Sequence, residues 1–374
     1  MDPDLTKQKR PVVMLANAGH RPLDTRIFFK ESKSLHEAGW PLTLIIPHKE
    51  DFVKEGIQVK AVRPPSKGWE QLVRCPWDIW KMARRESRRS VFHLHDSELL
   101  IVGLLLKLGG RTVVYDAHED TPLQISYQHW IPSWIKWAYS LFYRLLEKLA
   151  GWFFDAVIVA EPVIARYFPS RKVLLVRNFP IMASFKDEKP LSERKDQMVY
   201  VGLLSRPRGA AEMLAAFKEA RTRCGSVFVL GGKFAPAILE NQLLPQPGVQ
   251  FMSWLPYEKM IETLYESRIG VIVPNPIERY RTNYPVKLFE YMAAGMPVIA
   301  SREGESAAFV READAGILVN PLDPHEIAEA MVKLATDLSV AQEMGQRGRR
   351  LIQEKYNWEA EARKLVQLYS TLPD

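Results

Sequence analysis

The feature that most constrains the fold is a regular alternation of short apolar runs with longer stretches of helical periodicity. In the first half of the chain such runs begin at Val12, Leu42, Val91, Thr112, Ala156 and Val173. A second series begins at Met198, Val227, Val249, Gly270, Val298 and Gly316. Strands that are apolar throughout are typical of parallel sheets covered by helices on both faces. The sequence therefore predicts an α/β protein with two parallel sheets, one for each series.

A charged segment separates the two series. Residues 186–196 contain Pro190, many charges and few apolar side chains, which is typical of an interdomain linker. We therefore expect a doubly wound N-terminal domain at 1–185, a linker at 186–196 and a second doubly wound domain at 197–355. Ligands of such open sheets bind at the carboxyl ends of the strands.

Length and cysteine content fit this division. The 374 residues suffice for two domains. Cys75 and Cys224 are the only cysteines, too few and too far apart for a zinc cluster or a disulfide framework, so we expect both to be structural in a reducing compartment. We expect no signal peptide, and no apolar run reaches transmembrane length. We expect a cytoplasmic protein, with peripheral contact at the inner face of the membrane as a further prediction.

The net charge of +7 is concentrated in the N-terminal half, where residues 1–185 hold 27 Lys and Arg against 19 Asp and Glu. Much of this excess lies between Lys60 and Arg89, interleaved with Trp69, Trp77 and Trp80. Two interpretations stay open. The stretch is either a patch for anionic lipid or nucleic acid, or a solvated helix face whose tryptophans enter the core.

An aromatic stripe follows in the same half. Apolar residues recur at helical spacing, with Lys136, Arg144 and Lys148 nearby: Trp130, Trp134, Trp137, Leu141, Leu145 and Leu149. We expect most of this stripe to be domain core. Because Pro132 breaks its start, residues 130–134 also fit an aromatic anchor at a bilayer interface.

The densest motif lies between Arg281 and Ser301. A helix is predicted from Val286 to Ala294, with Glu290 as its only acidic residue, and Gly295 ends it before the next strand. Lys287 lies in the first turn, and a helix start that faces a crevice is an anion site. A second basic loop follows the strand at 198–201 and carries Arg206 and Arg208 before another helix.

Together these segments resemble the nucleotide-binding signature of the retaining glycosyltransferases of family four, the glycosyl transferases of group 1, which have the GT-B fold. The match is carried by Pro285, Lys287, Phe289, Glu290, Met292, Gly295, Pro297 and Val298. The resemblance implies two tandem Rossmann-like domains and a terminal helix, residues 356–374, that packs back on the N-terminal domain. It also implies that Glu290 binds the nucleotide ribose and that Arg208 and Lys287 bind the donor diphosphate.

The resemblance implies further site residues. His118, at the end of a strand, would lie beside the donor sugar and form the catalytic set with Arg208 and Lys287. The implied donor-binding residues are Gly19, Arg206, Arg208, Leu255, Asn275, Pro276, Lys287, Leu288 and Glu290. Two positions depart from the family. Leu203 replaces an arginine, for which Arg206 is the candidate substitute, and Thr282 replaces a glutamate that contacts the donor sugar.

Several polar residues have competing interpretations. We expect Asp24 to cap a helix rather than to act in catalysis. His95 and Asp96 are structural or line an acceptor cleft. The spacing at 93–96 and 116–120 could suit a metal, an interpretation that we reject. The only Asp-x-Asp triplet is at 2–4, so we expect fixed cations and helix amides to stabilise the leaving group without a metal.

The predicted function is a metal-independent, retaining glycosyltransferase of the hexosyltransferase class that uses no cofactor. It would move a sugar from a nucleotide donor such as a UDP- or GDP-sugar to a glycan or lipid-linked acceptor, in cell-envelope or exopolysaccharide biosynthesis. Retention rests on the resemblance alone. Since no carboxylate nucleophile for a double displacement can be nominated, we prefer front-side attack.

Other functions stay open. A sugar-nucleotide epimerase or a phosphorylase on the same fold is one. A non-catalytic sugar-nucleotide or membrane-binding module is another, in view of Leu203 and Thr282. Nucleic-acid binding lacks a recognisable motif, so we predict none. The sequence leaves the donor sugar, base, acceptor, linkage and oligomeric state undetermined.

Overall fold

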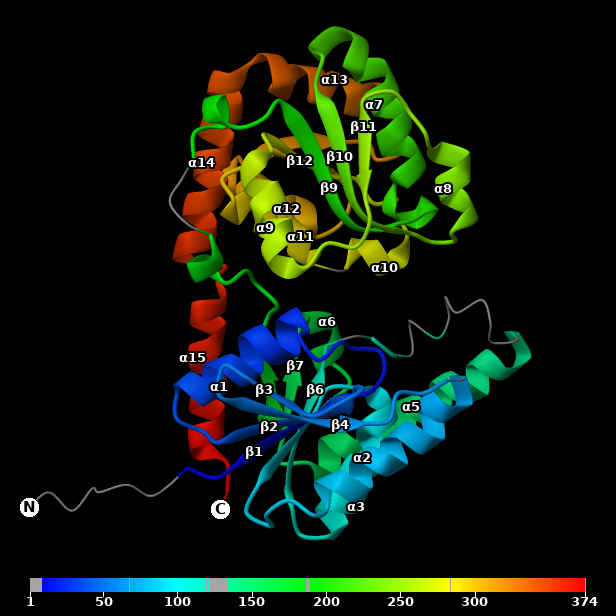
Figure 1. Ribbon diagram of the computed structural model, residues 1–374, viewed down its shortest axis with the longest axis vertical. Helices are drawn as coiled ribbons and strands as arrows, with labels where there is room; N and C mark the ends of the chain where they lie inside the picture. The colour runs from blue at the N-terminus through cyan, green and yellow to red at the C-terminus, as the bar shows by residue number, and fades with distance from the viewer. Residues whose placement is uncertain are drawn as a thin grey trace, which may run out of the picture. The chain divides into compact units, whose positions relative to one another are not determined.

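The computed structural model describes residues 9–66, 68–118, 120–121, 125, 133–185, 189–282 and 284–373. The chain forms two compact units. Unit 1 comprises Met1–Asn178 and Ala360–Asp374, and unit 2 comprises Phe179–Glu359. Each unit is built on a sheet of its own (Figure 1).

The division falls at Asn178 and Phe179, ahead of the charged segment at 186–196. The later part of that segment packs into unit 2. Leu191 is fully buried in its core, and the buried guanidinium of Arg194 donates hydrogen bonds to the carbonyls of Ser267 and Ala294. Buried charge of this kind needs such partners, which ties the segment to unit 2.

The sheet of unit 1 has eight strands in the order β3-β4-β2-β1-β5-β6-β7-β8. All pairs are parallel except β3 with β4. The strands are β1 (Val12–Leu15), β2 (Leu42–Pro47), β3 (Phe52–Lys54), β4 (Ile57–Val62), β5 (Val91–Leu94), β6 (Thr112–Ala117), β7 (Ala156–Val159) and β8 (Val173–Leu175).

The predicted parallel strands are confirmed, whereas the β3–β4 hairpin was not predicted. Its turn uses two left-handed residues, Glu55 with φ of 51° and Gly56 with φ of 79°. Ile57, Val59 and Val62 are buried, while Gln58 is exposed. This alternation is the signal of a strand with only one covered face, which a search for continuous apolar runs overlooks.

The helical segments of unit 1 begin with a π-helical stretch that continues directly into the first α-helix. They are η1 (Thr25–Ser32), α1 (Lys33–Glu37), η2 (Glu70–Arg74), α2 (Cys75–Ala83), η3 (Ser97–Leu99), α3 (Leu100–Leu108), α5 (Ser133–Phe153), α6 (Pro162–Ala165), η4 (Ser170–Lys172) and α15 (Trp358–Thr371).

Helix α15 belongs to unit 1 from Ala360 onward, as predicted for the terminal helix. Its Tyr369 hydroxyl lies 2.8 Å from Nδ1 of His93, and its ring packs edge-on against Trp40. The Glu361 carboxylate accepts a hydrogen bond of 3.0 Å from the backbone amide of Arg177. These contacts join the last helix to β5 and to the end of β8.

Unit 2 has a six-stranded sheet in the order β11-β10-β9-β12-β13-β14, parallel throughout. The strands are β9 (Gln197–Leu204), β10 (Val227–Phe234), β11 (Val249–Met252), β12 (Ile269–Ile272), β13 (Val298–Ser301) and β14 (Gly316–Val319). The helical segments are η5 (Met182–Ser184), η6 (Leu191–Glu193), η7 (Arg206–Arg208), α7 (Ala210–Cys224), α8 (Ile238–Leu243), α9 (Tyr257–Glu266), α10 (Glu278–Arg281), α11 (Val286–Ala293), α12 (Ser306–Ala313), α13 (Pro324–Thr336) and α14 (Leu338–Glu354).

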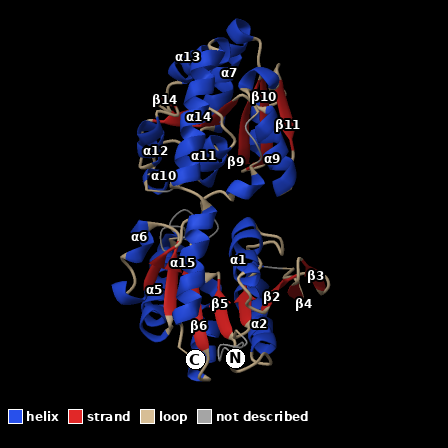
Figure 2. Cartoon of the chain, turned by 90° about the vertical axis from the view of Figure 1, so that its left-hand side faces the viewer, coloured by secondary structure: helices blue, strands red, loops and turns tan. Residues whose placement is uncertain are grey.

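Both faces of this second sheet are covered. One core cluster joins the sheet to α7 and α13 through residues such as Phe217 and Met331. The other joins it to α9, α11 and α12 through residues such as Leu264, Tyr291 and Val310 (Figure 2). The prediction of a parallel sheet covered on both faces is therefore confirmed for unit 2.

The prediction that the aromatic stripe of α5 is domain core is wrong. Trp134 and Trp137 are 79% and 73% exposed, and the opposite side of the helix, with Tyr143 and Ala150, packs on the sheet. Because α5 is apolar on both sides, periodicity alone could not tell which side is covered. Trp130 and Pro132 lie outside the described residues. Within the described chain, no helix combines the length and the apolar character needed to cross a bilayer.

Candidate active site

In unit 2, helix α11 presents a lysine from its first turn. Lys287 follows directly on Val286, and its Nζ lies 5.1 Å from the ring centre of Tyr200 on β9. As predicted, Gly295 ends the helix in a left-handed conformation, with φ of 70°. Removal from water lowers the pKa of Lys287 to about 7, and the charge of Arg208 adds to this while Glu290 opposes it. Of the predicted donor-site residues, Arg208 and Glu290 are thus both within electrostatic reach of Lys287.

A glycine makes room for this lysine. Gly202 has φ of 129°, and a Cβ at that position would overlap Cε and Nζ of Lys287. A Cβ on Gly232, the residue paired with Gly202 on β10, would overlap the carbonyl of Gly202. Glycine is therefore needed at both positions, and it lets the lysine lie directly against the backbone of β9.

The loop after β9 carries the arginines. Gly209 is left-handed, and a Cβ there would overlap the carbonyl of Val273, so the turn into α7 requires glycine. Arg208 is half-buried, and its Nε donates a hydrogen bond of 3.3 Å to the Tyr280 hydroxyl. Burial opposes the charge of Arg208, but Tyr200 and Tyr280 outweigh it and raise the pKa. Arg208 therefore offers a fixed cation near Lys287.

The two other positions in this loop differ from Arg208. Arg206 is exposed, and its Nη2 lies 3.4 Å from Oε1 of Gln242 on α8. Leu203 is 38% exposed, and its carbonyl accepts a hydrogen bond of 2.8 Å from the Tyr200 hydroxyl. Whether Arg206 takes over from an arginine at 203 stays a prediction.

The remaining predicted donor residues occupy distinct environments. Glu290 is only 5% exposed. Asn275 donates to the carbonyls of Pro207 and Arg206, and its buried Oδ1 accepts no hydrogen bond from the described residues. Pro276, next to it, is half-buried.

The two predicted leucines differ from each other. Leu255 is half-buried against Gly231, where a Cβ would lie 2.8 Å from its Cδ1. Leu288 is fully buried in the core, and its amide donates to the carbonyl of Pro285. Its side chain therefore supports α11 from the inside.

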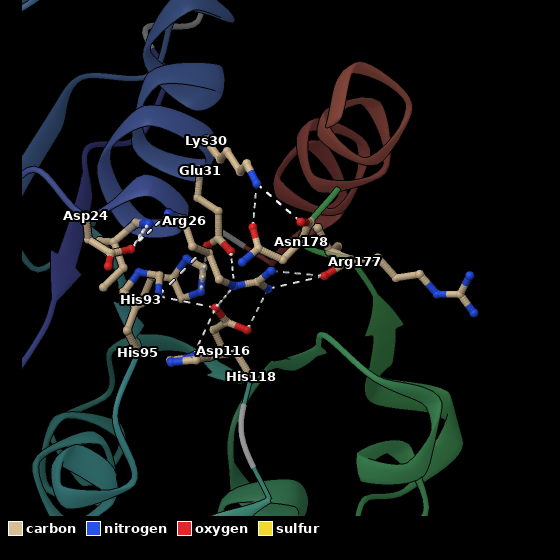
Figure 3. A network of polar contacts seen from close by, with 12 residues as sticks. Asp24, Arg26, Lys30, Glu31, His93, His95, Asp116, His118, Arg177 and Asn178 are labelled. Carbon is tan, nitrogen blue, oxygen red and sulfur yellow. Dashed lines mark hydrogen bonds and ion pairs between the residues drawn. The ribbon is translucent and has the colours of Figure 1, made fainter. Parts of the chain in front are cut away.

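Unit 1 holds a buried polar network at the carboxyl ends of its strands (Figure 3). Arg26 donates to both carboxylate oxygens of Asp116, at 2.7 and 2.9 Å, and to the carbonyl of Val176. Its Nε also lies 3.0 Å from Oε1 of Glu31. Nδ1 of His95 lies 3.3 Å from Oδ2 of Asp116. One guanidinium thus joins η1 to the ends of β6 and β8.

The charges of this network are divided unevenly. Burial raises the pKa of Glu31, and the neighbouring Asp116 charge raises it further. Burial would also raise the pKa of Asp116, but the Arg26 guanidinium and the adjacent imidazoles hold it well below its usual range. Burial lowers the pKa of His93 and of His95. The arrangement that follows is an ionised Asp116 paired with Arg26 beside a carboxyl and two imidazoles that favour their neutral forms.

His118 lies two residues beyond Asp116, at the partly exposed edge of this network. Its side chain is 17% exposed, and its Nδ1 lies 3.6 Å from Oδ2 of Asp116. Burial opposes protonation of His118, but Asp116 outweighs it and raises the pKa. Its ring packs edge-on against His20, with the ring centres 5.3 Å apart.

His20 forms a second charged cluster on the loop after β1. Its two ring nitrogens lie 3.6 Å from Asp24 and 3.1 Å from Asp96. Burial alone would lower the pKa of His20, but the two carboxylates raise it to about 11. Asp24 also accepts hydrogen bonds from the amides of Arg26 and Ile27, which confirms it as a helix cap.

A cavity of about 750 Å³ opens over these groups. Its lining combines polar residues such as His20, Asp96 and His118 with apolar and aromatic ones such as Trp69, Leu72, Tyr139 and Tyr143. A Cβ on Gly19 would meet nothing closer than Oδ1 of Asp96 at 3.8 Å, so no close neighbour requires glycine there. The cavity can accept a molecule with a polar and an apolar side.

Four buried side chains of the network could be considered as metal ligands, because their ligand atoms lie within 4.8 Å of one another: Glu31, His93, His95 and Asp116. Nε2 of His93 and both oxygens of Glu31 make no hydrogen bond with the described residues. The guanidinium of Arg26, however, lies against Glu31 and Asp116 and already provides the positive charge. This set therefore fits a divalent ion poorly. Asp2 and Asp4 lie outside the described residues.

Sequence reasoning missed the pairing of Arg26 with Asp116 and Glu31. Arg26, Lys30 and Glu31 are all buried, although they lie on a stretch whose charges suggest a solvated helix. Lys30 donates to Oδ1 of Asn178 at 2.6 Å. No local pattern marks these partners, since Asp116 and Asn178 are far away along the chain.

Both halves of the chain match family models of glycosyltransferases. A family model described as "Glycosyl transferases group 1" matches residues 195–337, and one described as "Glycosyl transferase 4-like domain" matches residues 29–178. A curated relative, the D-inositol 3-phosphate glycosyltransferase of Corynebacterium urealyticum, is 28% identical over 193 residues, 46% of this chain and 42% of the relative. The alignment therefore spans less than half the length of that relative.

Solved structures share the fold over nearly the whole chain. Sucrose-phosphate synthase of Thermosynechococcus elongatus has a TM-score of 0.74 at 20% identity, with 97% of this chain and 98% of that chain covered. HepE of Anabaena, solved in complex with UDP-glucose, has a TM-score of 0.71 at 14% identity, with 96% and 99% covered.

Proposed function

The chain belongs to the glycosyl transferases of group 1, family four, with the GT-B fold, and we propose that it transfers a sugar from a nucleotide-sugar donor to an acceptor bound in unit 1. The observation that carries this proposal is the cluster of Arg208, Lys287 and Glu290 in unit 2. The charges of Arg208 and of the buried Glu290 both act on Lys287, and two basic groups with one carboxylate are suited to a diphosphate and a ribose.

The cations would act on the leaving group. Negative charge develops on a diphosphate as the bond to the sugar breaks, and preorganised cations stabilise it without needing to move. Arg208 is held by Tyr280, and Lys287 is held beside Gly202, so both are positioned before the donor arrives. We propose that these two side chains stabilise the leaving diphosphate without a metal ion and that Glu290 accepts hydrogen bonds from the ribose hydroxyls.

The likeness to HepE supports a uridine nucleotide as the first donor to test, since that protein was solved with UDP-glucose. We propose that the donor is a UDP-hexose, that His118 contacts its sugar and that the cavity beside His118 takes the acceptor. Retention of the anomeric configuration through front-side attack, with a glycan or lipid-linked acceptor of the cell envelope, completes the proposal.

The proposal is tested with Glu290→Ala and a matched variant, Glu258→Ala, at an exposed carboxylate on α9. Loss of hydrogen bonds to a charged group costs about 1.5–3 kcal/mol, so UDP affinity measured by calorimetry should fall about tenfold to a hundredfold for Glu290→Ala only. Activity should survive EDTA. If Glu290→Ala binds UDP and turns over donor like the unmodified chain, the assignment of the site is wrong.

An epimerase on the same fold is separated by acceptor dependence. A transferase releases UDP in proportion to the acceptor supplied. An epimerase changes the sugar without an acceptor. UDP release that does not respond to any glycan or lipid acceptor would favour hydrolysis over transfer, and a changed sugar nucleotide without net UDP release would favour epimerisation.

A further inference from the structure

Helix α5 presents an apolar stripe that no described residue covers. We call this stripe, formed by Trp134, Trp137, Leu141, Leu145 and Trp152, the α5 face. All five side chains are at least 41% exposed, and the three tryptophans are 79%, 73% and 65% exposed. They recur every three or four residues, or a multiple of that, and extend over about 27 Å of helix. Single exposed apolar residues are common, but a stripe of this size marks an interaction surface.

The other side of α5 is committed to the fold. Tyr143, Leu146 and Ala150 of α5, and Phe154 directly after its end, are buried in the core of unit 1. Helix α3 lies next to α5 (Figure 1) and exposes Ile101, Leu105 and Leu108. The α5 face therefore lies on a helix whose opposite side is held in the core of unit 1.

The charges on α5 identify the kind of partner. Its only acidic residue, Glu147, is 3% exposed and faces inward. Arg144 and Lys148 are exposed on the same helix as the α5 face. Helix α3 contains no acidic residue. Tryptophans with neighbouring cations and no exposed anion match the headgroup region of an anionic bilayer, where indole rings favour the interface and lysine and arginine bind acidic lipids.

We propose that the α5 face docks unit 1 on an anionic phospholipid bilayer, with α5 lying in the plane of the interface. Since one side of α5 stays in the protein core, the helix lies on the bilayer and does not span it. The tryptophans enter the headgroup layer, and Arg144 and Lys148 contact lipid phosphates.

The position of the cavity extends this proposal to the acceptor. Tyr139 and Tyr143 of α5 line the cavity, and Trp69 and Leu72 both line it and are exposed. Since Tyr143 lies on the side of α5 that packs in the core, the exposed Trp69 and Leu72 are the side chains that would contact the apolar chains of a lipid whose polar head enters the cavity beside His118. This step rests on the proposed function and assigns the acceptor to membrane lipids that carry a hydroxyl-bearing headgroup. The docking itself does not depend on it.

The test is flotation of the full chain with vesicles of phosphatidylcholine alone or mixed with phosphatidylglycerol. We expect binding only to the anionic vesicles, reduced by high salt because the attraction is screened. Arg144→Glu/Lys148→Glu should weaken binding more than twentyfold, since each cation near an anionic surface contributes about a fivefold factor. Trp134→Ser/Trp137→Ser should abolish flotation.

Matched controls lie in unit 2. Trp254→Ser removes a tryptophan that is 56% exposed, and Lys218→Glu/Arg350→Glu makes the same charge change at exposed positions. Both controls should float like the unmodified chain. Circular dichroism and UDP calorimetry on every variant show that it is folded and that its nucleotide site is intact.

The proposal is overturned if the folded chain does not float with anionic vesicles or if the α5 variants float as well as the controls. It is also overturned if the unmodified chain is a dimer that Trp134→Ser/Trp137→Ser converts to a monomer, because the α5 face would then bind a second copy. If the unmodified chain binds UDP but does not float, only the docking proposal is refuted. If it floats but does not bind UDP, only the proposed function is refuted.

Discussion

The half-buried lysine of unit 2 makes nucleotide binding depend on pH. Lys287 has a pKa of about 7, so each pH unit above this value reduces its protonated fraction about tenfold, which costs about 1.4 kcal/mol of binding free energy. A diphosphate oxygen about 4 Å from Nζ contributes about 4 kcal/mol of attraction at an effective dielectric constant of 20, which is enough to keep the lysine charged when the ligand is bound. Binding above pH 7 must therefore take up a proton.

The direction of the effect follows from this difference. The free protein loses the lysine proton as pH rises through 7, while the complex retains it. UDP affinity should therefore be highest near pH 7 and weaken about tenfold for each pH unit up to pH 9. The phosphate itself does not reverse this trend, since its second pKa is near 6 and it is fully ionised in this range.

The assay is titration calorimetry with UDP between pH 7 and pH 9, repeated in two buffers of different ionisation enthalpy to count the protons taken up. Lys287→Arg keeps a charge at every pH and should give a flat profile, and Lys287→Gln should bind weakly without pH dependence. If the unmodified protein shows constant affinity over this range, or if Lys287→Arg shows the same slope, Lys287 does not titrate at the diphosphate site.

Four further changes probe other contacts. Gly202→Ala places a methyl group where Nζ of Lys287 lies, so UDP affinity should fall about tenfold while the free energy of unfolding drops by only about 1–2 kcal/mol. A variant that binds UDP as tightly as the unmodified chain would contradict the contact between Gly202 and Lys287. Asp116→Asn leaves a buried cation without its anion and should lower the free energy of unfolding in urea by about 3–5 kcal/mol. Glu31→Gln should instead stabilise the protein more at pH 8 than at pH 5. The pKa of Glu31 is raised in the folded protein, so the stability of the unmodified chain falls as pH rises above the pKa that Glu31 has when unfolded. Equal effects of the substitution at both pH values would count against that raised pKa. His118→Ala should lower turnover about a hundredfold or more with UDP affinity unchanged, and loss of UDP affinity instead would move His118 from the sugar to the nucleotide.

Local features of the fold were predictable from the sequence because they depend on neighbours along the chain. The end of α11 at Gly295 and the cap at Asp24 are examples, since each needs only a left-handed glycine or a carboxylate within hydrogen-bonding range of the next amides. The parallel strands follow from continuous apolar runs. The β3–β4 hairpin was missed because Gln58 and Lys60 interrupt its second strand.

The candidate site was predictable only in part. Lys287, Glu290 and Arg208 could be named from motifs, and in unit 2 the structure brings Arg208 and Glu290 within electrostatic reach of Lys287. That Gly202 leaves room for the Lys287 side chain could not be predicted from the sequence, since Gly202 lies on β9 and Lys287 on α11, far apart along the chain. The same holds for Arg26, whose partner Asp116 is 90 residues away.

By itself, the sequence determined the two parallel sheets, the helix that carries Glu290 and the cations that flank it. Only the tertiary structure decided which side of α5 enters the core, which charges are buried in pairs and which pKa values are shifted. The physical reason is range. Helical periods and caps are set by residues a few positions apart, whereas burial and charge pairing depend on which distant segments meet when the chain folds.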